Sequence, residues 1–159
     1  MIKEVNDKDV GRAIDLVNRV FSEFVAVDYA EQGRNTFQSH LKDKLQEVSG
    51  ALKSGDKKMW AYYKDDEILG VIATQRTSHI SLMFVDKQYH RQGLARQLLN
   101  VVLDELKKNT DLTQITVNSS PYAVKAYEHL GFVKTGGQEE KEGITFIPMT
   151  RSLLLRHTK

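Results

Sequence analysis

The chain has 159 residues, 40% of them hydrophobic, so it is long enough for one well-packed domain and too short for two. Its 23 basic and 21 acidic residues leave a formal net charge of +2, and this small charge does not indicate a nucleic-acid partner. The absence of cysteine excludes disulfides, thiolate metal sites and a cysteine nucleophile. Five histidines without paired spacing indicate no metal site. With neither a signal-peptide core nor a membrane-length apolar run, we expect a soluble cytoplasmic protein without a membrane partner.

The first part of the chain is predicted to form a short strand over residues 1–5 and then a helix. Asp7 suits the N-cap of that helix. Four apolar residues at helical spacing mark its inner face: Val10, Ile14, Val17 and Phe21. A loop containing Asp28 and Glu31 follows, and it leads to a second predicted helix at about residues 36–45.

Three successive antiparallel strands are predicted next. Residues 59–63 and 68–75 form a hairpin around the acidic turn at residues 65–67. The third strand, over residues 80–85, is apolar on both sides and therefore suits the interior of a sheet. Strict alternation assigns its two faces as follows: Ile80, Leu82 and Phe84 on one, Ser81, Met83 and Val85 on the other.

A polar turn, a glycine and a helix follow the third strand. Apolar residues recur at helical spacing after the glycine: Leu94, Leu98, Val102 and Leu106. The unpaired N–H groups and the positive dipole end of a helix start favour phosphate, and Gly93 and Ala95 let a ligand approach closely. Arg91 and Arg96 flank the turn and add positive charge. The pattern predicts a diphosphate site; the alternative is an ordinary corner with solvated arginines.

The last third of the chain contains a second informative stretch. A strand over residues 114–118 is followed by Ser120 and a proline, which suit the N-cap and first position of a helix. One face of that helix carries Ala123, Tyr127 and Leu130. Gly131 then suits a left-handed helix end. Two further strands are expected, over residues 132–136 and 144–149.

These two stretches together resemble the GNAT superfamily of N-acetyltransferases. His90-Arg91-Gln92-Gly93-Leu94-Ala95 stands where the family has Gln/Arg-x-x-Gly-x-Gly/Ala, with His90 departing from the usual first residue. The second family motif, a strand, a tyrosine-bearing helix and Gly-Phe, is matched from Thr116 to Phe132. The resemblance implies an α/β (α+β) fold over a single domain, residues 1–159. Its mixed, mostly antiparallel sheet would have about seven strands, flanked by about four helices.

The resemblance also implies acetyl-CoA (coenzyme A) as the acetyl donor, without a metal. Its diphosphate would bind the backbone of the turn and helix start: Arg91, Gln92, Gly93, Leu94, Ala95 and Arg96. The backbone of Met83, Phe84 and Val85 would pair with the pantetheine arm, admitted where this strand splays from the strand at residues 114–118. An N–H group near Phe84 or Val85 would stabilise the oxyanion formed when an amine attacks the thioester.

Tyr127 occupies the position of the family's general acid, which protonates the departing thiolate of coenzyme A. From the residues alone, the alternative is a half-buried core tyrosine. The resemblance loosely assigns cofactor contacts to Asn118 and Ser120, although the main role expected for Ser120 is the N-cap.

The general base is left open by the sequence. An alkylammonium with a pKa near ~10.4 must lose a proton before it attacks. His79 has a suitable unperturbed pKa of ~6.5 and is expected on the same strand face as Ser81 and Met83. Asp28, Glu31 and an ordered water are the alternatives.

We therefore expect an acetyl-CoA-dependent N-acetyltransferase that acts on the primary amine of a small-molecule acceptor. Acetylation of a protein N-terminus or lysine is an alternative, for which no acidic-peptide groove or strong basic patch is evident. A non-catalytic acyl-CoA-binding regulatory domain is another, and the presence of Tyr127 argues against it. The resemblance is compatible with a homodimer, although the sequence carries no clear interface signature.

Overall fold

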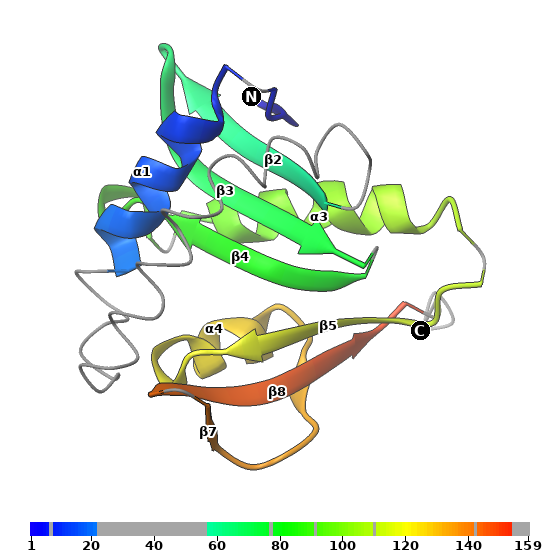
Figure 1. Cartoon of the computed structure of the whole chain (residues 1–159). Helices are drawn as coiled ribbons and strands as arrows, with labels where there is room; N and C mark the ends of the chain where they lie inside the picture. Colours follow the sequence, from blue (N-terminus) through cyan, green and yellow to red (C-terminus); the bar gives the residue numbers. More distant parts are fainter. Residues whose placement is uncertain are drawn as a thin grey trace.

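A sheet of eight strands forms the centre of the molecule, with α1 on one face and α3 on the other (Figure 1). The computed structural model describes residues 1–6, 8–21, 57–76, 78–90, 92–109, 111–141 and 143–153. The strands are β1 (Ile2–Glu4), β2 (Lys57–Lys64), β3 (Glu67–Gln75), β4 (His79–Val85), β5 (Gln114–Ser119), β6 (Val133–Lys134), β7 (Glu139–Lys141) and β8 (Ile144–Ser152). The helices are α1 (Val10–Val20), α3 (Leu94–Leu106) and α4 (Val124–His129), with 3₁₀ turns at Lys87–Tyr89 and Pro121–Ala123.

The strand order is β1-β2-β3-β4-β5-β8-β6, with β7 paired to β8. Only the β4–β5 pair is parallel among the described pairs, which confirms the predicted mixed, mostly antiparallel sheet. The strand beyond the predicted seven is β7, which folds back onto β8 through a turn where Gly143 has a φ of +82°. Three α-helices lie within the described ranges, and the helix predicted at residues 36–45 lies outside them.

The inner face of α1 is confirmed, but its start differs from the prediction. Asp7 lies outside the described residues, and the helix begins at Val10 with Asp9 as N-cap. The side chain of Asn6 accepts hydrogen bonds from the N–H groups of Lys8 and Asp9, at 3.0 and 3.2 Å. Because Asn6 engages these donors in a turn of its own, the helix starts only after that turn.

The predicted hairpin of β2 and β3 is confirmed. Lys64 pairs with Glu67, so the connection has two residues, and Asp65 and Asp66 adopt φ values of +51° and +67°. Two successive positive φ values are typical of a type I′ turn, whose twist matches that of the strands it joins. The adjacent antiparallel pair of β3 and β4 completes the predicted three-strand unit.

A β-bulge at Ser81 corrects the predicted faces of β4. Ile80 pairs with Thr74 and Leu82 with Ala73, so Ser81 has no partner in β3. One extra residue reverses the alternation, because neighbouring positions of a strand point to opposite faces. Ile80 therefore shares its face with Met83 and Val85, and Leu82 shares the other face with Phe84. The two sets of residues pack into two different hydrophobic clusters, one on each face of the sheet.

Each face of the sheet carries its own hydrophobic cluster. The α1 cluster joins α1 to β2 and β3, and its fully buried members include Val10, Val17, Met59 and Val71. The α3 cluster joins α3 and α4 to β3, β4, β5 and β8, and it includes the predicted helical stripe: Leu94, Leu98, Val102 and Leu106. Burial of these two amphipathic faces orients both helices against the central strands.

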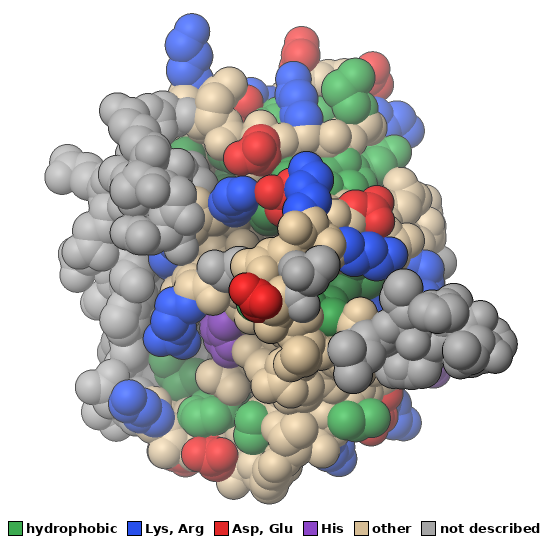
Figure 2. Space-filling model, turned by 90° about the vertical axis from the view of Figure 1, so that its right-hand side faces the viewer, with side chains coloured by type: hydrophobic (Ala, Val, Ile, Leu, Met, Phe, Trp, Pro, Cys, Tyr) green, Lys and Arg blue, Asp and Glu red, His purple; other side chains and the backbone are tan. Residues whose placement is uncertain are grey.

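The surface mixes both signs of charge. On the face that Figure 2 shows, basic and acidic side chains are interspersed rather than gathered into one large patch. Near the end of α3, Glu105 lies 2.9 Å from Lys58 and 3.1 Å from Lys108, and these hydrogen bonds lower the pKa of Glu105. Among the described helices, none has the length and apolar content that a membrane-spanning segment requires.

Candidate active site

The β4 and β5 strands diverge soon after they meet. They pair in parallel only through His79 with Thr116 and Ile80 with Val117, and β4 then continues to Val85 without pairing to β5 (Figure 1). The bulge at Ser81 lies at the point of divergence. The predicted splaying of these strands is therefore confirmed, and one edge of β4 is left open over its second half.

The peptide groups of β4 alternate between β3 and this open edge. The N–H of Asp86 donates to the carbonyl of Leu69 in β3 at 2.8 Å, so the carbonyl of Val85, on the other side of the same planar peptide, points the other way. Nε2 of His90 donates to that Val85 carbonyl at 2.7 Å. The second half of β4 pairs regularly with β3, so this alternation continues back along the strand. The backbone N–H and carbonyl groups of Val85 and Met83 face the open edge, and those of Phe84 face β3.

Two cavities meet at this open edge. The larger has a volume of about 510 Å³ and lies at the start of α3, with Gly93 and Arg96 in its wall. The smaller has a volume of about 160 Å³ and extends across β4 to the end of α1. Six residues line both cavities: Met83, Val85, His90, Tyr122, Ala123 and Tyr127. The two cavities therefore form adjoining parts of one site.

The start of α3 has the features of an anion site. Its first helical bond runs from the N–H of Gln97 to the carbonyl of Gly93 at 3.0 Å, so the N–H groups between them lack a helical acceptor. Gly93 has a φ of +82°, and a Cβ built on it would meet no atom within 4 Å. Glycine is thus required by the backbone angle, while the space beside it is open. The free N–H groups at this helix start and Arg96 in the cavity wall fit a diphosphate.

The polar side chains of the predicted diphosphate turn have different surroundings. Arg91 lies outside the described residues. Gln92 lines neither cavity, and its side chain donates to the carbonyl of Gln88 at 2.9 Å. Arg96 lines the larger cavity and donates to the carbonyl of His129 at 3.0 Å, at the end of α4.

A second arginine at the end of α4 was not predicted. Arg151 of β8 donates to the carbonyl of Leu130 at 2.8 Å. A Cβ added to Gly131 would contact the Arg151 side chain. Burial and the nearby Arg96 guanidinium lower the pKa of Arg151. Gly131 has the predicted left-handed conformation, with a φ of +94°. No local pattern identifies Arg151, because strand pairing far along the chain brings it to α4.

Tyr127 lies where the two cavities join. Its side chain is only 6% exposed and packs edge-on against Phe132, with ring centroids 5.4 Å apart. Burial raises the pKa of Tyr127, so its hydroxyl stays protonated at neutral pH. Within the described part of the chain this hydroxyl makes no hydrogen bond, and since no enclosed side-chain oxygen there lacks a partner, it opens onto the cavities. Its donor capacity is therefore available to a ligand in the site.

The segment before α4 supplies polar groups to the smaller cavity. Asn118 and Ser120 both line it. Ser120 accepts a hydrogen bond from the N–H of Ala123 at 3.2 Å, which confirms its predicted role as a cap. Tyr122, which was not predicted as a site residue, is 49% exposed and lines both cavities. An aromatic residue two positions after a helix cap was the signal available in the sequence.

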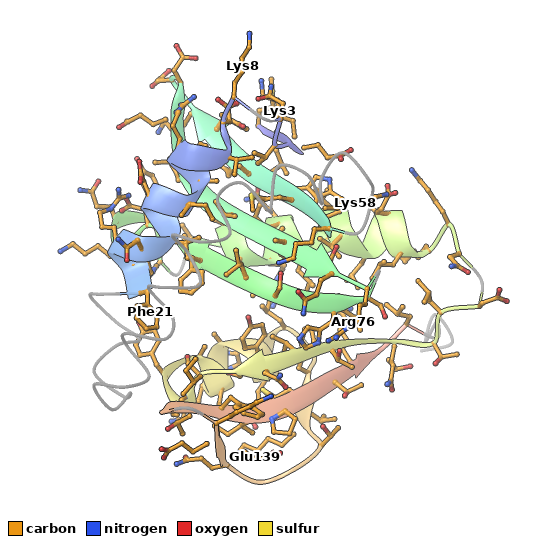
Figure 3. All side chains as sticks on the ribbon, in the orientation of Figure 1. Lys3, Lys8, Phe21, Lys58, Arg76 and Glu139 are labelled. Atoms are coloured by element: carbon orange, nitrogen blue, oxygen red, sulfur yellow. The ribbon has the colours of Figure 1, made fainter. Side chains whose placement is uncertain are left out.

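The structure does not bring His79 into either cavity. Figure 3 labels Phe21, which lines the smaller cavity, and Arg76 at opposite ends of the sheet. His79 is only three residues from Arg76, so it lies at the end of the sheet away from the cavity. Nδ1 of His79 shares a hydrogen bond of 2.7 Å with the hydroxyl of Thr116. The predicted common face with Met83 is wrong, because the bulge separates the two residues and reverses the alternation.

Comparison with known proteins agrees with these features. The sequence profile described as an acetyltransferase (GNAT) domain matches residues 25–153. The chain belongs to the GNAT family of acetyltransferases. An uncharacterized N-acetyltransferase, YitH, from Bacillus subtilis (strain 168) is 29% identical over 85 residues. N-acetyltransferase family 8 member 2 from Rattus norvegicus is 23% identical over 114 residues. These matches cover 54% and 65% of the chain, but only 29% and 50% of the two relatives.

Solved GNAT structures share the fold along almost the whole chain. A GCN5-related N-acetyltransferase from Rhodopseudomonas palustris has a TM-score of 0.76 at 16% identity, covering 96% of this chain and 94% of that one. The PaiA N-acetyltransferase from Thermoplasma acidophilum, in complex with coenzyme A, has a TM-score of 0.74 at 16% identity, covering 96% and 98%. An aminoglycoside 6′-N-acetyltransferase complexed with coenzyme A has a TM-score of 0.69 at 13% identity, covering 98% of each chain.

Proposed function

We propose that the chain transfers the acetyl group of acetyl-CoA to the primary amine of a small molecule, by direct attack of the amine on the thioester. The observation that carries the proposal is the open edge of β4, where an anion site at the start of α3 adjoins a smaller cavity at Tyr127. Membership of the GNAT family and the coenzyme A complexes of proteins with this fold support the same donor.

The donor's diphosphate is assigned to the start of α3. The free N–H groups after Gly93 and the guanidinium of Arg96 would hold it, and Leu94 and Ala95 supply the surrounding backbone. The outward-facing N–H and carbonyl of Met83 and the carbonyl of Val85 would pair with the pantetheine amides, as a strand partner would. When bound, acetyl-CoA supplies the acetyl group as a thioester in the smaller cavity. Asn118 and Ser120 would lie beside it.

Two groups of this chain are assigned to the reaction. The N–H of Val85 faces the open edge and would donate to the thioester carbonyl oxygen, whereas the N–H of Phe84 faces β3. The hydroxyl of Tyr127 would donate to the departing sulfur as general acid. Among the candidate bases, His79 lines neither cavity, and Asp28 and Glu31 lie outside the described residues. We assign the amine's proton to water.

The test is a transfer assay with the purified chain, acetyl-CoA and a panel of primary amines, read by mass spectrometry of the products. We expect an N-acetylated small amine, together with one equivalent of free coenzyme A. Acetylation confined to peptide N-termini or lysines would instead assign the chain to protein acetylation. Coenzyme A binding without transfer to any acceptor would identify a non-catalytic acyl-CoA binder.

A further inference from the structure

The wall of the smaller cavity on the α1 side of the sheet is apolar. Val20 and Phe21 at the end of α1 line it, together with Leu82 and Phe84 of β4. Figure 3 shows the Phe21 side chain extending beyond the last turn of α1, away from that helix. Leu82 and Phe84 reach this side because the bulge at Ser81 reverses the alternation of β4. We call these four residues the apolar wall; Val20 and Phe21 are 4% and 0% exposed, so Leu82 and Phe84 supply its accessible surface.

The polar residues described around the same cavity carry no negative charge. They are Ser81, His90, Asn118, Ser120, Tyr122 and Tyr127. Ser120 and His90 already make hydrogen bonds within the chain. Asp86, which directly follows β4, is not part of the lining, and its carboxylate binds Arg19 at 2.7 Å and the N–H of Gln88 at 2.9 Å. The described lining therefore offers no carboxylate to a second cationic group.

A cation that leaves water needs an opposite charge or several hydrogen bonds, whereas an alkyl or aryl group gains from leaving water. We infer from the apolar wall that the acceptor is a monoamine whose remaining part is alkyl or aryl and packs on that wall. This inference rests on the proposed function and specifies its acceptor class.

The apolar wall also favours the reactive form of such an acceptor. Transfer of an alkylammonium ion to apolar surroundings disfavours the charged form and releases its proton more readily. Only the neutral amine has the lone pair that attacks the thioester carbon. The acceptor's apolar group then stays against Leu82 and Phe84, while its nitrogen lies toward Tyr127 and the open edge of β4.

The first experiment compares hexylamine with 1,6-diaminohexane, which has the same chain length and one additional amine. We expect kcat/KM for hexylamine to be at least about tenfold higher, although the diamine offers two reactive groups. Spermidine and kanamycin extend the comparison to polycations, and 2-phenylethylamine extends it to aryl monoamines. A diamine or polycation used as well as its apolar counterpart would overturn the inference and leave the acetyltransferase assignment intact.

A matched pair of variants tests the wall directly. Leu82→Asp adds a carboxylate to the partly buried wall, and Leu82→Asn adds polarity of similar size without charge. We expect Leu82→Asp to shift the preference toward 1,6-diaminohexane by about tenfold relative to Leu82→Asn. Coenzyme A binding reports that each variant is folded. An equal shift in both folded variants would overturn the role of the wall; if either variant does not fold, the wild-type comparison decides alone.

If the wild-type chain acetylates no amine of any class, the proposed function and this inference fall together. If it acetylates other amines but neither monoamine, only the inference falls.

Discussion

Tyr127 combines a buried ring with a hydroxyl that has no described hydrogen-bond partner. Tyr127→Phe should therefore leave the free energy of unfolding within about 0.5 kcal/mol of the wild-type value. Loss of a general acid should lower kcat about 100-fold, with coenzyme A affinity nearly unchanged. Steady-state kinetics and calorimetric titration with coenzyme A measure the two effects separately. An unchanged kcat would remove Tyr127 from the proposed mechanism.

His79 offers a residue-scale test of the base. Because His79 lines neither cavity, His79→Gln should keep kcat within about twofold, whereas loss of a general base costs about 100-fold or more. A loss of that size, with coenzyme A binding intact, would restore His79 as the base and contradict the assignment of water.

The same variant gives a pH prediction. Burial, and then the positive charge of Arg76, lower the pKa of His79 below its usual 6.5. The unfolded chain then binds a proton more readily than the folded chain, so this group destabilises the fold as the pH falls below about 6.5. Urea denaturation at pH 8 and pH 5 should show a smaller loss of unfolding free energy for His79→Gln than for the wild type. An equal loss in both proteins would show that His79 does not contribute.

At the scale of elements, two glycines have opposite roles. Gly93→Ala should lower the free energy of unfolding by about 1–2 kcal/mol, because a Cβ is strained at a φ of +82° although nothing occupies its space. It should also weaken coenzyme A binding, since the start of α3 must change its conformation to relieve that strain. Calorimetric titration and urea denaturation measure both effects.

Gly11→Ala is the matched control. Gly11 lies inside α1 and a Cβ there would meet no atom within 4 Å, so alanine should raise the free energy of unfolding by about 0.5–1 kcal/mol. Coenzyme A affinity should stay unchanged, because Gly11 lines neither cavity. Equal losses of affinity in Gly93→Ala and Gly11→Ala would contradict the diphosphate assignment.

At the scale of the whole molecule, the open edge of β4 makes stability depend on the donor. A ligand that binds only the folded state at about 100 times its dissociation constant adds about 2.7 kcal/mol to the free energy of unfolding. For a chain of this length, that corresponds to a rise in Tm of roughly 5–10 °C with acetyl-CoA. Differential scanning fluorimetry measures the rise. No shift at millimolar acetyl-CoA would contradict donor binding.

The sequence by itself determined the elements whose signals are local. The apolar stripes of α1 and α3, the cap at Ser120, and the glycines at Gly93 and Gly131 all depend on neighbours within a few residues. Those signals also sufficed for the family, because both of its motifs are short strand–turn–helix segments. The fold and the two stretches that form the candidate site were therefore predictable.

Only the tertiary structure decided which side chains share the site. The bulge at Ser81 depends on pairing with β3, and it moved Leu82 to the α1 face and separated His79 from Met83. Arg151 reaches the end of α4 only through β8, far from it in sequence. Local sequence patterns could not predict the positions of Leu82, His79 and Arg151, because strand register is set by contacts between distant segments. The chemistry of the smaller cavity is therefore a property of the assembled sheet.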